Sequence, residues 1–206
     1  MSALTIYLEG GGDTKEQKGQ LRQGMDAFLK SAKDRFREKR WGWKLVACGG
    51  RQEAFDSFIW ARNQAKTGEI VILLVDSEAP VTATCRADHL RQRQGDGWDL
   101  SGVPDNHIHL MVQSMEAWIV ADPEALEAYY GQGFQRNALP RRKNLEGEPK
   151  ADCARKLKAA TSKTKTKGAY HKINHASELL KIISPDKVRV RCPHAEILFK
   201  TLLDLV

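Results

Sequence analysis

The stretch Ile70-Val71-Ile72-Leu73-Leu74-Val75-Asp76-Ser77-Glu78 decides the fold, because an unbroken apolar run ends in two closely spaced carboxylates. Such a run, flanked by helical patterns, is typical of a strand buried on both faces of a parallel sheet. Two further stretches share the pattern of an apolar run that leads to a carboxylate: Ile6-Tyr7-Leu8-Glu9-Gly10-Gly11-Gly12-Asp13 and Met111-Val112-Gln113-Ser114-Met115-Glu116. Ligands collect at the carboxyl ends of strands in open α/β sheets. We therefore expect these acids to converge on one site.

Strands and helices alternate outward from these stretches. We expect an α/β fold with a mostly parallel sheet of about four strands, at residues 4–8, 44–48, 70–75 and 108–112. One long amphipathic helix is expected after the glycine-rich turn, with its apolar face formed by Leu21, Met25, Phe28, Ala32 and Phe36. Further helices are expected at residues 51–66, 85–94, 114–120, 123–130, 151–160, 175–183, 185–191 and 195–205, and a loop at 131–149. Residues 1–130 would form the α/β core, and residues 131–206 a basic helical extension packed on the same domain.

Composition excludes several classes of protein. The chain has 206 residues, of which 41% are hydrophobic and 29% charged, as in ordinary globular proteins. No apolar run approaches the roughly 18 residues that a membrane span requires, and the first residues do not resemble a signal peptide. The cysteines at 48, 85, 153 and 192 are scattered and form no Cys-x-x-Cys pair. These features predict reduced thiols in a cytoplasmic protein that does not associate with membranes.

Charge is unevenly distributed along the chain. Residues 1–130 hold 16 Lys and Arg against 19 Asp and Glu, whereas residues 131–206 hold 17 against 7, so that the net charge is +7. This distribution would suit a metal-binding part joined to a part that binds a polyanion such as nucleic acid. A solvated basic surface without a partner accounts for it equally well.

The acids at the expected strand ends suggest a metal site. Glu9, Asp76, Glu78 and Glu116 offer the oxygen ligands that Mg²⁺ or Mn²⁺ prefers. Crowded carboxylates without a cation would repel one another and raise each other's pKa, so the cluster implies a compensating ion. Alternatively, each acid merely caps a neighbouring helix or turn. Acids at three successive strand ends favour the metal site.

Two weaker patterns suggest other ligands. His107 and His109 would share one side of a strand, and His171 and His175 would lie one helical turn apart; both spacings can bind zinc, although no supporting motif accompanies them. Gly10-Gly11-Gly12-Asp13 permits close approach of a phosphate to a helix N-terminus. It matches no nucleotide-binding fingerprint, and a tight turn is equally compatible with it.

These acids stand in a chain that resembles a bacterial family designated domain of unknown function 4276. The resemblance covers nearly the whole sequence and rests on Leu8-Glu9-Gly10, Leu74-Val75-Asp76-Ser77-Glu78, Met111-Val112-Gln113-Ser114-Met115-Glu116-Ala117-Trp118, Ala121-Asp122-Pro123, Tyr170-His171-Lys172, His175-Ala176 and Ser184-Pro185-Asp186-Lys187-Val188-Arg189. That family is grouped with the Toprim-like folds, which include the overcoming-lysogenization-defect type nucleases. Toprim proteins carry a Glu after the first strand and Asp-x-Asp after a later one. Here these would be Glu9 and the pair Asp76 and Glu78, with Glu in place of the second Asp.

The resemblance implies a metal-dependent nuclease that acts in bacterial defence against phage. Glu9 would then be the general base or a metal ligand, with Asp76, Glu78 and Glu116 as ligands of Mg²⁺ or Mn²⁺. Lys172 would neutralise charge in the transition state. The resemblance also implies a P-loop ATPase of the ABC or SMC type as partner. The sequence is compatible with a homo-oligomer and does not define an oligomeric state.

Basic residues outside the acidic stretches are candidates for contacts with the phosphate backbone of DNA or RNA. Residues 136–172 hold twelve Lys and Arg against three acids. Few aromatic side chains lie among them, which argues against base stacking in that region. The candidate contacts are Arg51, Arg141, Arg142, Lys143, Lys163, Lys165 and Lys167. Two other functions remain open: a non-catalytic subunit with a structural metal that binds an ATPase or nucleic acid, and phosphoryl or nucleotidyl transfer by the same acids.

Overall fold

A computed structural model describes residues 2–206. In this part of the chain, four parallel strands form one sheet in the order β2-β1-β3-β4. The strands are β1 (Ala3–Glu9), β2 (Gly42–Gly49), β3 (Glu69–Asp76) and β4 (Ile108–Met111). The expected α/β fold with a parallel sheet is thereby confirmed. Parallel pairing places the carboxyl ends of all four strands at the same edge of the sheet.

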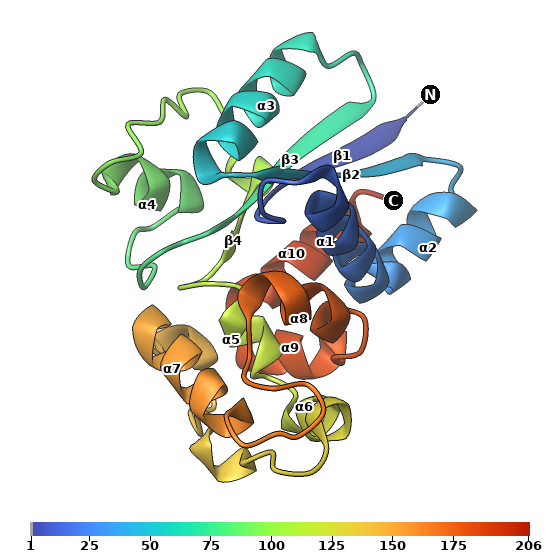
Figure 1. Cartoon of the computed structure of the whole chain (residues 1–206). Helices are drawn as coiled ribbons and strands as arrows, with labels where there is room; N and C mark the ends of the chain where they lie inside the picture. The colour runs from blue at the N-terminus through green and yellow to red at the C-terminus, as the bar shows by residue number, and fades with distance from the viewer. Residues whose placement is uncertain (1) are drawn as a thin grey trace.

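Helices cover both faces of the sheet (Figure 1). Their bounds are α1 (Lys15–Phe28), α2 (Lys30–Glu38), α3 (Arg51–Gln64), α4 (Arg86–Gln92), α5 (Glu116–Ile119), α6 (Pro123–Tyr130), α7 (Lys150–Thr161), α8 (Lys172–Leu180), α9 (Pro185–Arg191) and α10 (Pro193–Asp204). Leu4, Ile6 and Leu8 of β1 pack into the larger hydrophobic cluster with α1, α2 and α10. Val71, Leu73 and Val75 of β3 face the second cluster, which α3 and α4 close.

The long amphipathic helix expected after β1 is two helices in the structure. The break lies at Leu29, whose N–H still donates to Met25 O at 2.9 Å while its carbonyl accepts from Lys33. The apolar face is nevertheless continuous, since Leu21, Met25, Phe28, Ala32 and Phe36 are all buried. The interruption therefore reorients the chain without removing any of these side chains from the core.

The segment between α6 and α7, expected to be loop, contains two short 3-10 turns at Arg136–Ala138 and Leu145–Gly147. The second half of the chain then forms α7 to α10. Figure 1 shows α5 to α9 gathered beyond the end of β4, so these helices approach the carboxyl ends of the strands. Helix α8 packs along α1 and also contacts α5 and α6. Within residues 2–206, no helix combines the length and apolar character needed to cross a membrane.

Candidate functional site

Three carboxylates meet at the carboxyl edge of the sheet. Glu9 ends β1, Asp76 ends the neighbouring β3, and Glu78 follows two residues later. One oxygen of each lies within 4.8 Å of the others, close enough for the three to bind one metal ion together. The β1–β3 pairing juxtaposes these side chains, because Leu8 and Leu74 are direct partners in the register. The site is therefore a consequence of strand order.

Glu9 is held from two sides through a single oxygen. Its Oε2 accepts from the Asp76 backbone N–H at 3.1 Å and from Arg51 Nη1 at 3.1 Å. Arg51 in turn forms a salt bridge with Asp96 at 2.7 Å and lies 4.6 Å from the centre of the Trp98 ring. The other oxygen of Glu9 accepts no hydrogen bond from residues 2–206, so it can serve as a ligand.

Asp76 is the most deeply buried acid of the three, with 3% of its surface exposed. Its Oδ1 accepts from the backbone N–H of Met115 at 2.9 Å, which ties β3 to the segment after β4. Burial raises the pKa of Asp76 to about 7, and the charges of Glu9 and Glu116 act in the same direction while Lys172 opposes them. A bound cation would favour the ionised form of this carboxyl.

Glu78 and Gln113 both adopt left-handed backbone conformations, with φ of +65° and +64°. The two residues are linked, because the Glu78 N–H donates to Gln113 O at 3.2 Å. The side-chain oxygen of Gln113 accepts from the Lys150 N–H at 3.2 Å, which fixes the start of α7. Lys150 Nζ then forms a salt bridge with Glu78 Oε1. Strained backbone of this kind persists where the surroundings impose it and is common at functional sites.

Glu116 lies beside the three carboxylates but outside the metal-binding group. Its Oε1 accepts from the Tyr170 hydroxyl at 3.2 Å, and its Oε2 lies 3.6 Å from Lys172 Nζ. Lys172 Nζ is also 3.4 Å from Asp76 Oδ2. Burial lowers the pKa of Lys172, but attraction by Asp76, Glu116 and Glu9 outweighs it and the net shift is upward. Lys172 therefore stays charged and bridges Asp76 to Glu116.

Charge compensation differs from the sequence-based expectation. The sequence predicts that the acids need a bound cation, yet Arg51, Lys150 and Lys172 supply positive charge within the chain. The predicted phosphate contact by Arg51 stays a prediction, but in this structure its guanidinium positions Glu9 and Asp96. Metal binding at this site would therefore displace or rearrange a lysine and would not simply relieve repulsion.

The other predicted nucleic-acid contacts lie away from the carboxylates. Arg141, Lys143, Lys163 and Lys165 have exposed side chains. Arg142 pairs with the buried Glu148, and Lys167 lies 4.6 Å from the centre of the Tyr129 ring. The Lys-Thr stretch is folded, because Thr164 is buried and its hydroxyl bonds to Thr161 O and Gly168 O.

Neither histidine pair forms a metal site in this structure. His107 lies in a 3-10 turn before β4, while His109 is fully buried with Nε2 at 3.1 Å from Asn106 O. His171 precedes α8, and its backbone N–H donates to His175 Nδ1 at 3.2 Å. Within residues 2–206, the metal-capable group of three contains carboxylates alone.

Sequence reasoning missed four residues that shape the site: Lys150, Asp96, Gln113 and Tyr170. Lys150 and Tyr170 come from the helical second half, far from the acids in sequence, so no local spacing relates them to Glu78 or Glu116. Asp96 lies in the turn-rich stretch 94–97, where an acid between glycines is typical of a turn. Gln113 belongs to the stretch that leads to Glu116, but only its left-handed backbone explains its importance.

The fold and the site together define an α/β protein with an acidic, metal-capable centre at the carboxyl ends of adjacent parallel strands. The chain belongs to the family described as domain of unknown function (DUF4276), whose family model matches residues 8–203. No curated protein and no solved structure gives a significant match to this sequence.

Proposed function

We propose that this chain is a Mg²⁺- or Mn²⁺-dependent nuclease of the Toprim type, which hydrolyses phosphodiester bonds in bacterial defence against phage. The observation that carries the proposal is the convergence of Glu9, Asp76 and Glu78 from adjacent strand ends, with their oxygens within 4.8 Å of one another. Lys172 and Lys150 lie at the same edge. A site with both acids and ammonium groups suits a metal-bound phosphodiester.

The donor set fits a hard divalent cation. All three ligand candidates are carboxylates, and oxygen ligands are what Mg²⁺ and Mn²⁺ prefer. Each carboxylate is anchored through one oxygen by a backbone N–H or a basic side chain, and the remaining oxygens are free or, for Asp76, 3.4 Å from Lys172. This anchoring would orient the ligands before binding. A bound ion would activate water and stabilise negative charge on the phosphate.

The side chains of the chain itself would supply the remaining functions. Arg51 and the Asp76 N–H keep Glu9 ionised and oriented, so that its free oxygen can accept a proton from the attacking water. Lys172 would stabilise charge that develops on the phosphate oxygens. Tyr170 holds Glu116, which in turn holds Lys172 in place.

A second candidate function is a non-catalytic subunit that binds nucleic acid or a P-loop ATPase and holds a structural ion. The observation that favours it is the salt-bridging of the acids by Arg51, Lys150 and Lys172. A site already neutralised by its own lysines can be stable without chemistry. The basic second half would then provide the docking surface.

Cleavage assays with purified chain separate the two functions. Labelled plasmid DNA, single-stranded DNA and tRNA would be incubated with Mg²⁺, Mn²⁺ or EDTA, with and without an ABC- or SMC-type ATPase. Wild-type chain is expected to cleave at least one substrate in a metal-dependent manner. Asp76→Asn is expected to lower the rate by about a thousandfold or more, as loss of a group that acts within a catalytic unit typically does.

Asp56→Asn, at an exposed position of α3, is the matched control and should retain full activity. Equal cleavage by Asp76→Asn would point to a contaminating nuclease and overturn the proposal. Salt-sensitive binding of nucleic acid without cleavage under any of these conditions would support the non-catalytic subunit instead.

A further inference from the structure

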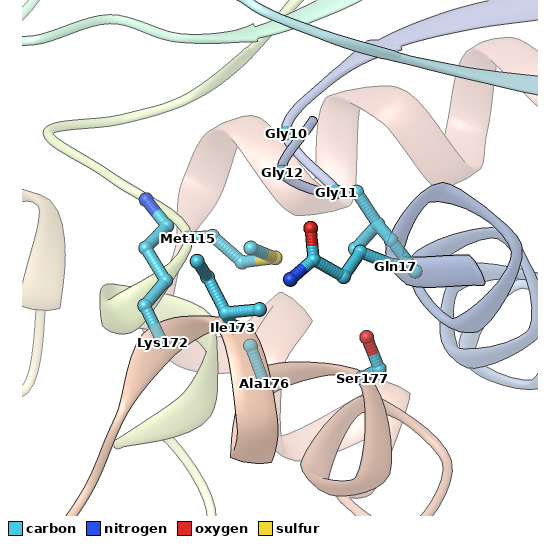
Figure 2. A pocket seen from close by; sticks show the side chains of 10 residues that line it. Gly10, Gly11, Gly12, Gln17, Met115, Lys172, Ile173, Ala176 and Ser177 are labelled. Carbon is cyan, nitrogen blue, oxygen red and sulfur yellow. The ribbon is translucent and has the colours of Figure 1, made fainter. Parts of the chain in front are cut away.

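A small cavity of about 100 Å³ adjoins the carboxylates. Two features connect it to the site: Lys172 lines the cavity and reaches Asp76, and Met115 lines it while its N–H bonds to Asp76 Oδ1 at 2.9 Å. The glycine turn that follows Glu9 forms another wall. Figure 2 shows the cavity between this turn, the start of α1 and one side of α8.

Gln17 presents a hydrogen-bond donor to this cavity. Its Oε1 accepts from the Thr14 N–H at 3.3 Å while the Thr14 hydroxyl accepts from the Gln17 N–H at 3.2 Å, a reciprocal capping box at the start of α1. The cap therefore fixes the amide orientation and leaves the Nε2 group free. In Figure 2 this nitrogen points into the cavity, toward Met115 and Ile173. Gly12 permits the arrangement, because a Cβ there would lie 2.4 Å from Gln17 Oε1.

Ser177 adds a second polar group to the lining. Its hydroxyl forms no hydrogen bond with any other group in residues 2–206, although the residue is buried. The remaining walls are apolar side chains, contributed by Leu21, Met115, Ile173 and Ala176. The cavity is thus an apolar slot with a fixed amide donor, a free hydroxyl and the ammonium of Lys172 at its rim.

We propose that this slot binds a pyrimidine base of the nucleic-acid strand, next to the phosphate held at the carboxylates. The inference rests on the proposed nuclease function and specifies its substrate. A cavity of about 150 Å³ holds one benzene ring, so the present slot with its open mouth accommodates one six-membered ring and excludes a purine. The flat faces of a base match the apolar walls, and the carbonyl oxygen common to cytosine and uracil would accept from Gln17 Nε2.

Other ligands fit the lining less well. A phosphate would gain nothing from the start of α1, because its first N–H groups are engaged by the capping box. A sugar would bury hydroxyls against Leu21, Met115 and Ile173 without partners, which costs free energy. A base stacked within a duplex cannot enter a slot of this kind. The substrate is therefore single-stranded or locally unpaired at this position.

Mononucleotide binding tests the slot without requiring cleavage. Full-length chain in Mg²⁺ would be titrated calorimetrically with cytidine 5′-monophosphate and adenosine 5′-monophosphate. The cytidine nucleotide is expected to bind at least about tenfold more tightly, the factor that corresponds to one well-made hydrogen bond. Gln17→Glu keeps the capping acceptor but replaces the amide donor with a carboxylate. It is expected to abolish the preference, whereas Gln20→Glu, exposed on the same helix, should retain it.

Filling the mouth of the slot is the second test. Ile173→Trp should block the cytidine nucleotide, whereas Ile182→Trp, at another partly exposed isoleucine, should not. Equal binding of the two nucleotides, no binding of either, or unchanged preference in Gln17→Glu would overturn the slot. Binding with the expected preference but no cleavage of any nucleic acid would overturn the nuclease and leave the slot standing. Cleavage without any base preference at the position beside the cut would do the reverse.

Discussion

Buried titratable side chains mark both the site and the core, and their partners differ. Asp76 accepts a backbone hydrogen bond and lies against Lys172, as suits a side chain that must be charged when an ion binds. His109, in the middle of β4, has no exposed surface, and its Nδ1 has no hydrogen-bond partner among residues 2–206. Its ring is therefore neutral in the folded chain, with the proton on Nε2 facing Asn106 O.

His109 should make the fold sensitive to acid. Burial lowers the pKa of His109 to about 3, with Arg86 acting in the same direction, whereas the unfolded chain takes up the proton near its ordinary pKa. Between about pH 6.5 and pH 3 the unfolded state binds one proton more, so stability falls as pH falls, by roughly 1 kcal/mol per pH unit. His109→Gln should flatten this part of the profile in urea unfolding experiments. The control His171→Gln, at an exposed position, should follow the wild-type slope.

At the scale of elements, the site depends on how closely α8 approaches α1. A Cβ added to Gly24 would lie 2.4 Å from Ser177 O, so only glycine permits the two helices to pack at this distance. Helix α8 begins with Lys172 and also presents the cavity wall. The packing of these helices consequently places the ammonium opposite Asp76 and Glu116.

Two glycines of α1 provide a matched pair for testing this packing. Gly24→Ala should destabilise the chain by about 1 to 3 kcal/mol, the usual cost of overpacking, despite the better helix propensity of alanine. Gly19→Ala, which would meet no atom within 4 Å, should instead stabilise it by about 0.5 to 1 kcal/mol. Chemical unfolding of both variants measures the difference. Equal effects of the two substitutions would contradict a close approach of the helices at Gly24.

Helix α7 contributes the cation that occupies Glu78. Lys150 neutralises this carboxylate in the metal-free chain and would compete with an incoming ion. Lys150→Met is expected to tighten Mn²⁺ binding about fivefold, which corresponds to roughly 1 kcal/mol for a partly exposed ion pair. Calorimetric Mn²⁺ titration would measure this change. Lys158→Met, exposed on the same helix, should bind Mn²⁺ as the wild type does; weaker binding by Lys150→Met would mean that Lys150 supports the metal site.

At the scale of the whole molecule, the acids lie on the sheet and the excess positive charge lies in the second half of the chain. Simultaneous replacement of Lys163, Lys165 and Lys167 by alanine should weaken nucleic-acid binding and lower its dependence on salt. The slope of log affinity against log salt should decrease by about one for each phosphate that these lysines neutralise in the wild type. Replacement of Lys30, Lys39 and Lys66, exposed lysines of the first half, should change the slope little. Identical slopes for the two triple variants would exclude a specific basic surface.

The sequence by itself determined the strands, their parallel arrangement and the acids at their ends. Ile70 to Val75 could belong only to a strand buried on both faces, and the carboxylates that follow such strands must meet at one edge of a parallel sheet. The helix break at Leu29 could not be predicted in this way, because the apolar spacing of Leu21 to Phe36 is satisfied equally by one helix or two.

Only the tertiary structure decided which charges meet the acids. Strand order β2-β1-β3-β4 places Glu9 directly beside Asp76, while Glu116 falls outside the metal-capable group because Tyr170 and Lys172 hold it. Lys150 and Gln17 acquire their roles from helices that reach the site after long separations in sequence. The physical reason is that periodicity specifies which face of an element is buried, whereas contacts between elements depend on packing distances that close approaches such as Gly24 against Ser177 determine.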